Sequence, residues 1–391
     1  MSITASELVR PSFTEWHATV IGPTGVSVGE SAAAAYRELA SAMRAAGVES
    51  FQEKVYCAAG SRDELEAARR AALERRGIEH TTPWAHVRGR DDGGSNASAV
   101  CVQLWGVTRR STDVRVSTLA SGRHRGRLVE GPGVRMLWLA SIDGSDVHGA
   151  LPPGIAAQAE SMFGSAEHAL ASAGFSFRDV ARTWIYAREL LASYRAINGV
   201  RTAFYAARGI GSRSDARHFP ASTGIQGRAN DEECMMDLLA IRTAGLDARV
   251  TPLERSDRQG PAFAYGSSFS RAVSVELEGR QTLLVSGTSS IGPDGGTLHP
   301  NDPERQSVET LLGLAALIRP LGATLADVAT GTLFTRDADA LAAFDRAAGS
   351  MRLPALPLVR VYADVCRPDL TVEIEAIVHV PTAVAPPGVR R

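Results

Sequence analysis

Apolar and polar side chains follow one pattern that occurs three times along the chain. In each copy, a helix with apolar residues at 3.6-residue spacing ends in small residues and a glycine, and a strand follows. A second helix, a loop and an apolar closing strand complete the copy. The pattern predicts first helices at 31–47, 156–174 and 305–322, second helices at 63–77, 191–209 and 338–351, and closing strands at 98–107, 234–242 and 370–380.

The first helix of each copy ends at a glycine, where we expect the left-handed conformation that closes many helices. These glycines are Gly47, Gly174 and Gly322. Because the helices are amphipathic and the closing strands are largely apolar, we expect two helices to pack against one face of a mixed sheet in each copy. The repeat therefore predicts an α+β fold built from tandem units.

The spacing of the copies places the unit boundaries at 1–108, 109–245 and 246–391. The first unit is expected to be degenerate, because only a short strand segment at 17–25 precedes its first helix. Three like units in one chain can pack about a pseudo-threefold axis. Such packing would imitate a homotrimer and would place pockets between neighbouring units.

The composition is that of a folded protein without an excess of positive charge. The 391 residues are 44% hydrophobic and 22% charged, and the formal net charge is −1. This balance gives no electrostatic reason to expect nucleic acid or an anionic membrane as partner. The sequence has no run of about 18 apolar residues and no signal-peptide core. We expect a cytoplasmic protein that is a monomer or a weak homo-oligomer.

The residues that commonly hold metals are scattered. The four cysteines, Cys57, Cys101, Cys234 and Cys366, form no CxxC pair, and the nine histidines form no HExxH pattern. We therefore expect no metal site and no disulfide framework. Lys54 is the only lysine, so nearly all cationic side chains are arginines, which can hold carboxylates through two parallel hydrogen bonds.

Two glutamates lie on the last predicted strand. Alternation places Glu373 and Glu375 on one face of the segment LTVEIEAIVHV and apolar residues on the other. If that face is buried, carboxylates about 7 Å apart raise each other's pKa, and one of them stays protonated near neutral pH. An edge strand with both glutamates in water is the alternative. The corresponding slots in the other copies, Gln103 and Asp237, are polar too.

Two further segments carry candidate ligand-binding groups. In ARTWIY at 181–186, alternation puts Arg182 and Tyr186 on one face with the tryptophan between them, so that they could contact one ligand. In FPASTGI at 219–225, Thr223 offers a hydroxyl and Gly224 allows close backbone approach. The alternatives are an arginine stretched over the surface and a plain turn at the entry of a strand.

The third unit resembles the YjgF (RidA) family across nearly its full length, most clearly in VEIEAIV at 372–378. A narrower resemblance, to the chorismatases, covers roughly residues 80–380. It rests on ARTWIY, FPASTGI, FSRA at 269–272 and ADVCRPDLTVEIE at 363–375, in that order. The resemblance implies tandem YjgF-like units with a chorismate-mutase-like α/β sandwich fold. It also implies an enzyme that removes pyruvate from chorismate without metal or cofactor.

The same resemblance assigns roles to individual residues. It makes Glu373 the general acid that protonates the enol ether of chorismate. Cys366 matches chorismatases that form 3-hydroxybenzoate, whereas Ala272 matches the hydrolytic type. We give Cys366 more weight, because a polarisable thiol beside the reacting ring matters more than one methyl group. Arg346 matches a family arginine that would hold a substrate carboxylate. The other expected substrate contacts are Arg182, Tyr186, Thr223 and Gly224.

Three other functions remain open at this point. The first is a chorismate hydrolase that forms a trans-dihydroxycyclohexadiene carboxylate, and an amino-substituted chorismate is a further candidate substrate. The second is a YjgF-like imine deaminase, although Leu358 stands where the hallmark arginine of that activity would fall. The third is a metabolite-binding module without catalysis.

Overall fold

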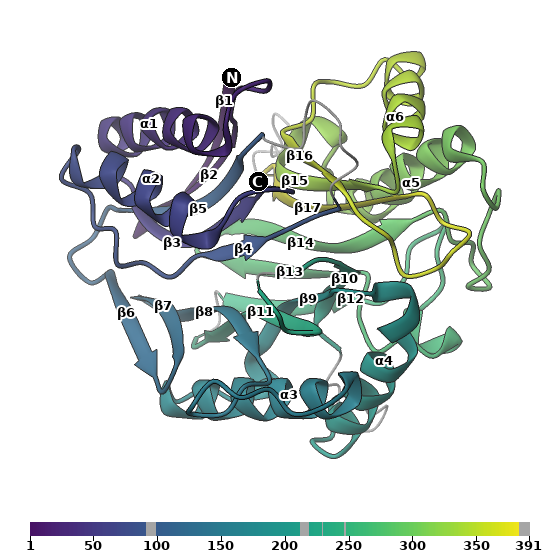
Figure 1. The fold of residues 1–391 in the computed structure, drawn as a ribbon, viewed down its shortest axis with the longest axis horizontal. Helices are drawn as coiled ribbons and strands as arrows, with labels where there is room; N and C mark the ends of the chain where they lie inside the picture. The colour runs from purple at the N-terminus through teal and green to yellow at the C-terminus, as the bar shows by residue number, and fades with distance from the viewer. Residues whose placement is uncertain (91–98, 212–218, 229, 246–247, 383–391) are drawn as a thin grey trace, which may run out of the picture.

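The chain folds into three mixed sheets, and two helices cover the outer face of each sheet (Figure 1). This computed structural model describes residues 1–90, 99–211, 219–228, 230–245 and 248–382. The expected α+β fold of three tandem units is confirmed. The sheets face one another around a common centre, with the helices outside.

The first sheet has five strands in the order β1-β2-β5-β3-β4, one strand fewer than each of the other sheets. Helix α1 begins after Ser27, whose hydroxyl accepts a hydrogen bond from the backbone N–H of Glu30. It ends at Gly47, which has the expected left-handed conformation. The elements are β1 (Ser2–Val9), β2 (Phe13–Ile21), α1 (Val28–Ala46), β3 (Glu49–Tyr56), α2 (Arg62–Glu74), β4 (Ala85–Val87) and β5 (Cys101–Arg109).

The second and third sheets share one topology. Their strand orders are β10-β9-β11-β8-β7-β6 and β16-β15-β17-β14-β13-β12. The second unit contains β6 (Arg115–Ser121), β7 (His124–Gly131), β8 (Val134–Asp143), α3 (Ile155–Ser172), β9 (Val180–Ala187), α4 (Leu190–Ala206), β10 (Ala221–Gln226) and β11 (Cys234–Thr243). The third contains β12 (Ala248–Leu253), β13 (Ala272–Leu277), β14 (Arg280–Ser289), α5 (Pro303–Ile318), β15 (Val328–Thr335), α6 (Ala338–Ser350), β16 (Leu358–Tyr362) and β17 (Val372–Val380).

Two details differ from the elements predicted from the sequence. Helix α5 ends at Ile318 instead of continuing to Gly322, because Pro320 lies in a separate 3-10 turn that follows it. In each unit, the loop expected between the second helix and the closing strand contains a short strand. These strands, β4, β10 and β16, pair in parallel with β3, β9 and β15.

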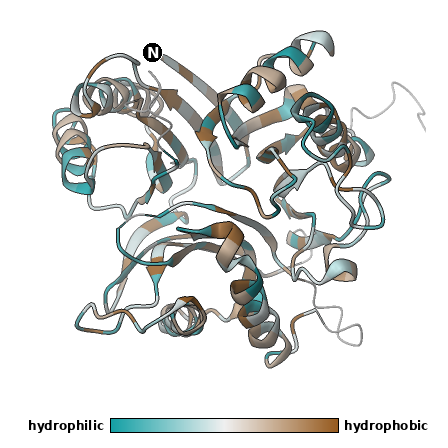
Figure 2. Cartoon of the chain, turned by 45° about the vertical axis from the view of Figure 1, so that its right-hand side comes forward, coloured by the Kyte–Doolittle hydropathy of each residue, from teal (hydrophilic) through white to brown (hydrophobic). Residues whose placement is uncertain are grey.

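Alternation along the strands divides the apolar side chains into inner and outer cores. On β17, Val372 and Ile374 pack toward the helices of the third unit. The inner faces of the three sheets form a central core that includes Phe51, Trp138 and Leu284, one from each unit. Burying a side chain of this kind contributes about 1.5–3 kcal/mol. The helices carry mixed apolar and polar positions, as expected for helices with one face on a sheet (Figure 2). None of the helices in the described ranges is long and apolar enough to cross a membrane.

Candidate active site

A cavity of about 300 Å³ lies between the second and third units. Helix α4 and strand β10 of the second unit line one side of it. Strands β14 and β17 of the third unit line the other side, together with the segments around 265–271 and 366–367. The cavity therefore has the inter-unit position that the sequence repeat predicts for a pocket.

Glu373 points into this cavity from β17 and is only 4% exposed. Its Oε2 accepts a hydrogen bond of 3.0 Å from the hydroxyl of Ser289, its partner on β14. Burial raises the pKa of Glu373 to about 7, although the hydrogen bond from Ser289 opposes part of this rise. A substantial fraction of Glu373 therefore carries a proton near neutral pH. The group can act as a general acid.

A bulge in β14 makes room for the Glu373 carboxyl. The register between β14 and β17 shifts between Val285 and Thr288, so Gly287 lies in the bulge beside the cavity. A Cβ atom at Gly287 would collide with Oε1 of Glu373. The glycine therefore sets the position of the acid.

The neighbouring Glu375 faces inward from the same strand but has a different environment. Its Oε2 accepts hydrogen bonds from Nη2 of Arg182 at 2.8 Å and from the Thr223 hydroxyl at 2.5 Å. Its Oε1 accepts a hydrogen bond from the Thr332 hydroxyl at 3.2 Å. Glu375 is thus paired with an arginine, whereas Glu373 accepts its hydrogen bond from a neutral hydroxyl.

Two buried arginines of the cavity have no carboxylate partner among the described residues. Arg201, on α4, is 4% exposed and donates to Ser222 at 3.2 Å and to Asn198 at 2.6 Å. Arg271, just before β13, is 1% exposed and donates to the carbonyl oxygen of Gly260 at 3.0 and 2.9 Å. All of these acceptors are neutral. Because burying uncompensated charge is costly, the two guanidinium groups favour an anionic ligand.

Cys366 and an aromatic wall complete the lining. The Cys366 thiol is half-buried, and burial raises its pKa to about 12, with further help from Glu373. The sulfur is therefore a neutral thiol at neutral pH and not a thiolate nucleophile. The Arg271 guanidinium carbon lies 5.4 Å from the ring centre of Tyr265 and 5.5 Å from that of Phe269. These rings keep the arginine in place and offer an apolar surface to a cyclic ligand.

Three of the residues selected from the sequence line the cavity, namely Glu373, Cys366 and Gly224. Thr223 and Arg182 lie behind it, where both hydrogen-bond to Glu375. Tyr186 lies deeper, at the centre of the molecule, and accepts a hydrogen bond from Lys54. The ARTWIY face thus positions a carboxylate of the protein, and its side chains do not line the cavity.

Ala272 and Arg346, two other residues expected to contact substrate, also lie outside the cavity. The methyl group of Ala272 packs in the helix-side core of the third unit, with Val285 and Leu314, and does not line the cavity. Arg346 lies on the outer surface of α6, where its side chain is 60% exposed and pairs with Glu304 at 3.2 Å. Neither side chain is placed to contact a ligand of Glu373.

The cavity arginines were not selected from the sequence. Arg201 occupies a position of α4 at which helical spacing predicts an apolar residue, between the buried Ile197 and Tyr205. An arginine in that stripe is the signal that could have identified it. Arg271 is part of the FSRA motif and is adjacent to Ala272, so the motif indicates the right segment, but the arginine and not the alanine lines the cavity.

The other two unit junctions also contain cavities, of about 540 Å³ and about 180 Å³. Strand pairing places Met235 and Cys101 at the positions that correspond to Glu373. The polar residues Gln103 and Asp237 correspond to Glu375. The cavity between the second and third units is thus the one among these three that has a carboxyl group at this position.

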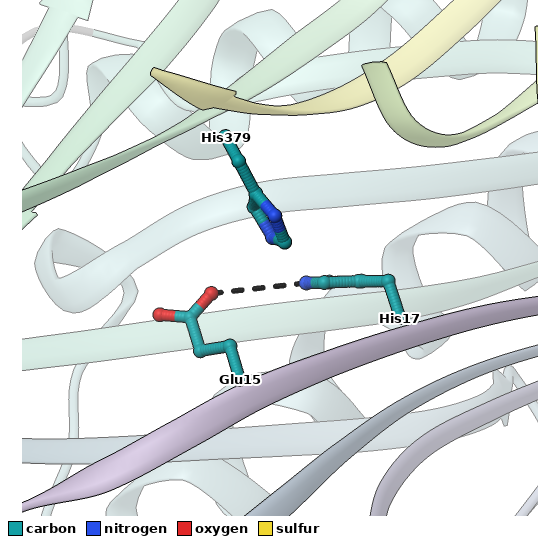
Figure 3. Close-up of side chains that lie close together, drawn as sticks. All are labelled: Glu15, His17 and His379. Carbon is teal, nitrogen blue, oxygen red and sulfur yellow. Dashed lines mark ion pairs between the residues drawn. The ribbon is translucent and has the colours of Figure 1, made fainter. Parts of the chain in front are cut away.

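One cluster of side chains has the composition of a metal site. Glu15, His17 and His379 offer ligand atoms that lie within 4.8 Å of one another, and all three side chains are buried (Figure 3). However, the guanidinium group of Arg10 already pairs with Glu15 at 2.5 Å, and the positive charge of this arginine opposes the binding of a cation. Long-range contacts assemble this cluster, which is why no sequence motif indicated it. It is distinct from the cavity that contains Glu373.

The chain is similar to several known proteins in sequence or structure. The family model "Endoribonuclease L-PSP" matches residues 262–380. A crystal structure of chorismatase superposes with a TM-score of 0.58 and 20% identity, over 84% of this chain and 93% of that one. RidA from the Antarctic bacterium Psychrobacter is 20% identical over 32% of this chain and 97% of its own, with a TM-score of 0.27. The Escherichia coli YjgF gene product is 18% identical over 30% and 86%, with a TM-score of 0.24.

A search of curated protein sequences found no match to this chain. At 20% identity, the similarity to chorismatase establishes a shared fold over most of both chains. The chain therefore has the chorismatase fold, and its third unit matches the endoribonuclease L-PSP family.

Proposed function

We propose that this protein is an enzyme that acts on chorismate and releases pyruvate from its enol-pyruvyl ether. Chorismate carries two carboxylates and an acid-labile enol ether on a cyclohexadiene ring. The proposal rests on one observation, namely a protonatable Glu373 in a cavity whose two buried arginines have no carboxylate partner among the described residues. The shared fold with chorismatase supports the same reading.

In the proposed reaction, Arg201 and Arg271 hold the substrate carboxylates. Glu373 then donates its proton to the methylene carbon of the enol ether, which creates an oxocarbenium-like centre at the ether carbon. In the non-hydrolytic route, the neighbouring ring hydroxyl oxygen displaces pyruvate from the ring carbon, so that the electrons of the broken ring C–O bond form the keto group of pyruvate; the resulting epoxide opens and the ring loses a proton to give 3-hydroxybenzoate. In the hydrolytic route, water adds to the oxocarbenium carbon, and the hemiketal then collapses to pyruvate and the ring diol. A carboxylic acid of raised pKa suits this step, because it holds a proton near neutral pH and is still acidic enough to donate it. The chemistry requires neither a metal nor a cofactor.

The two candidate products differ by one water molecule. Loss of pyruvate without net addition of water leaves a hydroxybenzoate, whereas hydrolysis leaves a dihydroxycyclohexadiene carboxylate. We favour 3-hydroxybenzoate, because Cys366 lines the cavity as a neutral thiol. Ala272, the residue that matches the hydrolytic type, has its methyl group in the helix-side core.

The single chain supplies both walls of the cavity, so the proposed reaction requires no partner subunit. An imine deaminase is less well supported. Leu358, which stands in place of the hallmark arginine, packs in the helix-side core of the third unit. A binding module without catalysis would not explain the raised pKa of Glu373 beside two arginines.

Incubation of the purified protein with chorismate distinguishes these functions. Pyruvate is measured with lactate dehydrogenase, and the ring product is identified by mass spectrometry. The proposal predicts stoichiometric pyruvate and 3-hydroxybenzoate. Pyruvate with a dihydroxycyclohexadiene carboxylate would support the hydrolase alternative. Unchanged chorismate would reject both, and an assay with an imine would then test the deaminase.

A further inference from the structure

A small chamber, separate from the Glu373 cavity, lies where the three sheets meet. Its volume of about 30 Å³ is enough for one or two water molecules or a single small ion. Side chains from all three units line it, including Gln52 and Lys54 from the first unit, Arg182 from the second and Glu375 from the third. An occupant of this chamber would contact every unit of the pseudo-trimer.

Lys54, the only lysine of the sequence, lies at this chamber and is 3% exposed. Its Nζ lies 3.5 Å from the ring centre of Trp184 and donates to the Tyr186 hydroxyl at 3.1 Å. The nearest Asp237 oxygen is 3.9 Å away, which is beyond hydrogen-bond distance. Burial lowers the pKa of Lys54 to about 7, against the opposing effect of Glu375 and Asp237. The lysine thus forms an ion pair with Asp237 but no hydrogen bond to it.

Three other buried N–H groups of the chamber have no hydrogen-bond partner among the described residues. They are Nη1 of Arg182, Nε2 of Gln52 and Nε1 of Trp105. All three side chains belong to residues that are at most 6% exposed. Buried polar groups in folded proteins are almost always paired, so these donors indicate an occupant that accepts hydrogen bonds.

Most acceptors of the chamber are already in use. The exception is His17, whose two ring nitrogens have no hydrogen-bond partner among the described residues and which in its neutral form offers one acceptor and one donor. Both oxygens of Glu375 accept hydrogen bonds, from Arg182, Thr223 and Thr332. The carbonyl oxygen of Gly331 accepts one from Gln103 at 2.6 Å. A water molecule needs acceptors for its own two hydrogens, whereas a halide ion only accepts. The donors without a partner outnumber the free acceptor, and this excess of donors favours an anion.

We propose that the chamber binds one halide-sized monovalent anion, of the chloride class, between the three units. Lys54 and Arg182 supply its positive charge, and the amide of Gln52 and the indole of Trp105 supply neutral hydrogen bonds. The anion acts as an internal counter-ion that ties the three sheets together. This role is independent of the reaction at Glu373.

Bromide replaces chloride and can be located by anomalous diffraction. The protein is unfolded in urea and refolded in sodium bromide, so that a buried site can fill, and is then crystallised. The proposal predicts one strong anomalous peak in the chamber. A chamber without an anomalous peak, filled by water or empty, would overturn it.

Thermal unfolding gives a second, independent test. After refolding at matched ionic strength, wild-type protein in chloride or bromide is expected to have a Tm several degrees above that in methanesulfonate, which is too large for the chamber. The difference should saturate with concentration and vanish in K54M, but persist in the surface control R346Q. Equal Tm values for the wild type in all three salts would contradict the proposal. If K54M does not fold, the wild-type crystals and melting curves decide.

Discussion

The Ser289 hydroxyl donates a 3.0 Å hydrogen bond to Oε2 of Glu373 across the pairing of β14 with β17. This bond favours the ionised carboxylate and so works against burial, which favours the protonated acid. The balance of these two effects gives Glu373 a pKa of about 7. The hydrogen bond can be removed without changing Glu373 itself, so its effect on the pKa of Glu373 can be tested.

Replacing Ser289 by alanine should extend activity to higher pH. Without the hydrogen bond, the pKa of Glu373 rises further, and the acid keeps its proton in more alkaline solution. We expect the alkaline limb of the profile of kcat against pH to move upward by about one unit. The matched control is S290A, because the neighbouring Ser290 hydroxyl donates to the carbonyl oxygen of Leu298 instead. An unchanged or downward-shifted limb in S289A would contradict this assignment.

Replacing Glu373 by glutamine should stabilise the fold in alkaline solution. A carboxyl group with a raised pKa binds its proton more tightly in the folded state. Its contribution to stability is therefore full at low pH and is lost as the pH rises through about 7. Glutamine never acquires the buried charge. Urea unfolding should show E373Q more stable than wild type by about 1–3 kcal/mol at pH 8.5, with a smaller difference at pH 5. A difference that does not depend on pH would show that Glu373 does not titrate in this range.

Removing either cavity arginine should weaken catalysis through substrate binding. A charge-assisted hydrogen bond to a carboxylate is worth about 1.5–3 kcal/mol, which corresponds to a roughly 10–100-fold change in kcat/KM. We expect losses of this size for R201M and R271M in steady-state kinetics with chorismate. The surface variant R346Q should stay within about twofold of wild type, because its partner is the exposed Glu304. If R346Q lost as much kcat/KM as R271M, the loss could not be attributed to substrate binding by the cavity arginines.

Adding a methyl group at Gly287 should displace the acid. The new Cβ would occupy the space of Oε1 of Glu373, so the carboxyl group must rotate out of position. We expect G287A to lose at least about tenfold in kcat while still folding, because small displacements of catalytic groups are costly. The control is G349A on α6, where no neighbouring atom lies within 4 Å of the added Cβ. Full activity in G287A would show that the carboxyl position is not critical.

Replacing Cys366 by alanine tests the choice between the two products. If the thiol directs aromatisation, C366A should release pyruvate but shift the product from 3-hydroxybenzoate toward the dihydroxycyclohexadiene carboxylate. The ratio of the two products, measured by liquid chromatography, is the readout. C234A is the control, because Cys234 is buried in the helix-side core of the second unit. An unchanged product ratio in C366A would show that the thiol does not determine which product forms.

Much of the fold could be predicted because apolar periodicity repeats three times over long segments. The six helices and the three closing strands all lie within a few residues of their predicted positions. The short parallel strands were missed for a physical reason. Strand β4, for example, has only three residues, Ala85–Val87, and its pairing with β3 is a long-range contact that local sequence does not encode.

The site was predictable to the extent that one strand face defines it. Alternation on β17 placed Glu373 on the inner face, and the structure places it there. The same rule explains the error at Ala272. Neighbouring residues on an extended chain point to opposite faces, so Arg271 lines the cavity while Ala272 packs beneath the helices. Arg346 was expected to contact substrate but lies on the outer surface, because a helical pattern does not reveal whether a polar helix face borders a cavity or the solvent.

The most direct test of the account is pyruvate release from chorismate by wild-type protein and by E373Q, measured side by side at pH 6.5. The account predicts steady turnover by wild type and a loss of at least about a thousandfold in E373Q, with the variant still folded by circular dichroism. Comparable pyruvate release by the two proteins would contradict the central claim that Glu373 donates the proton.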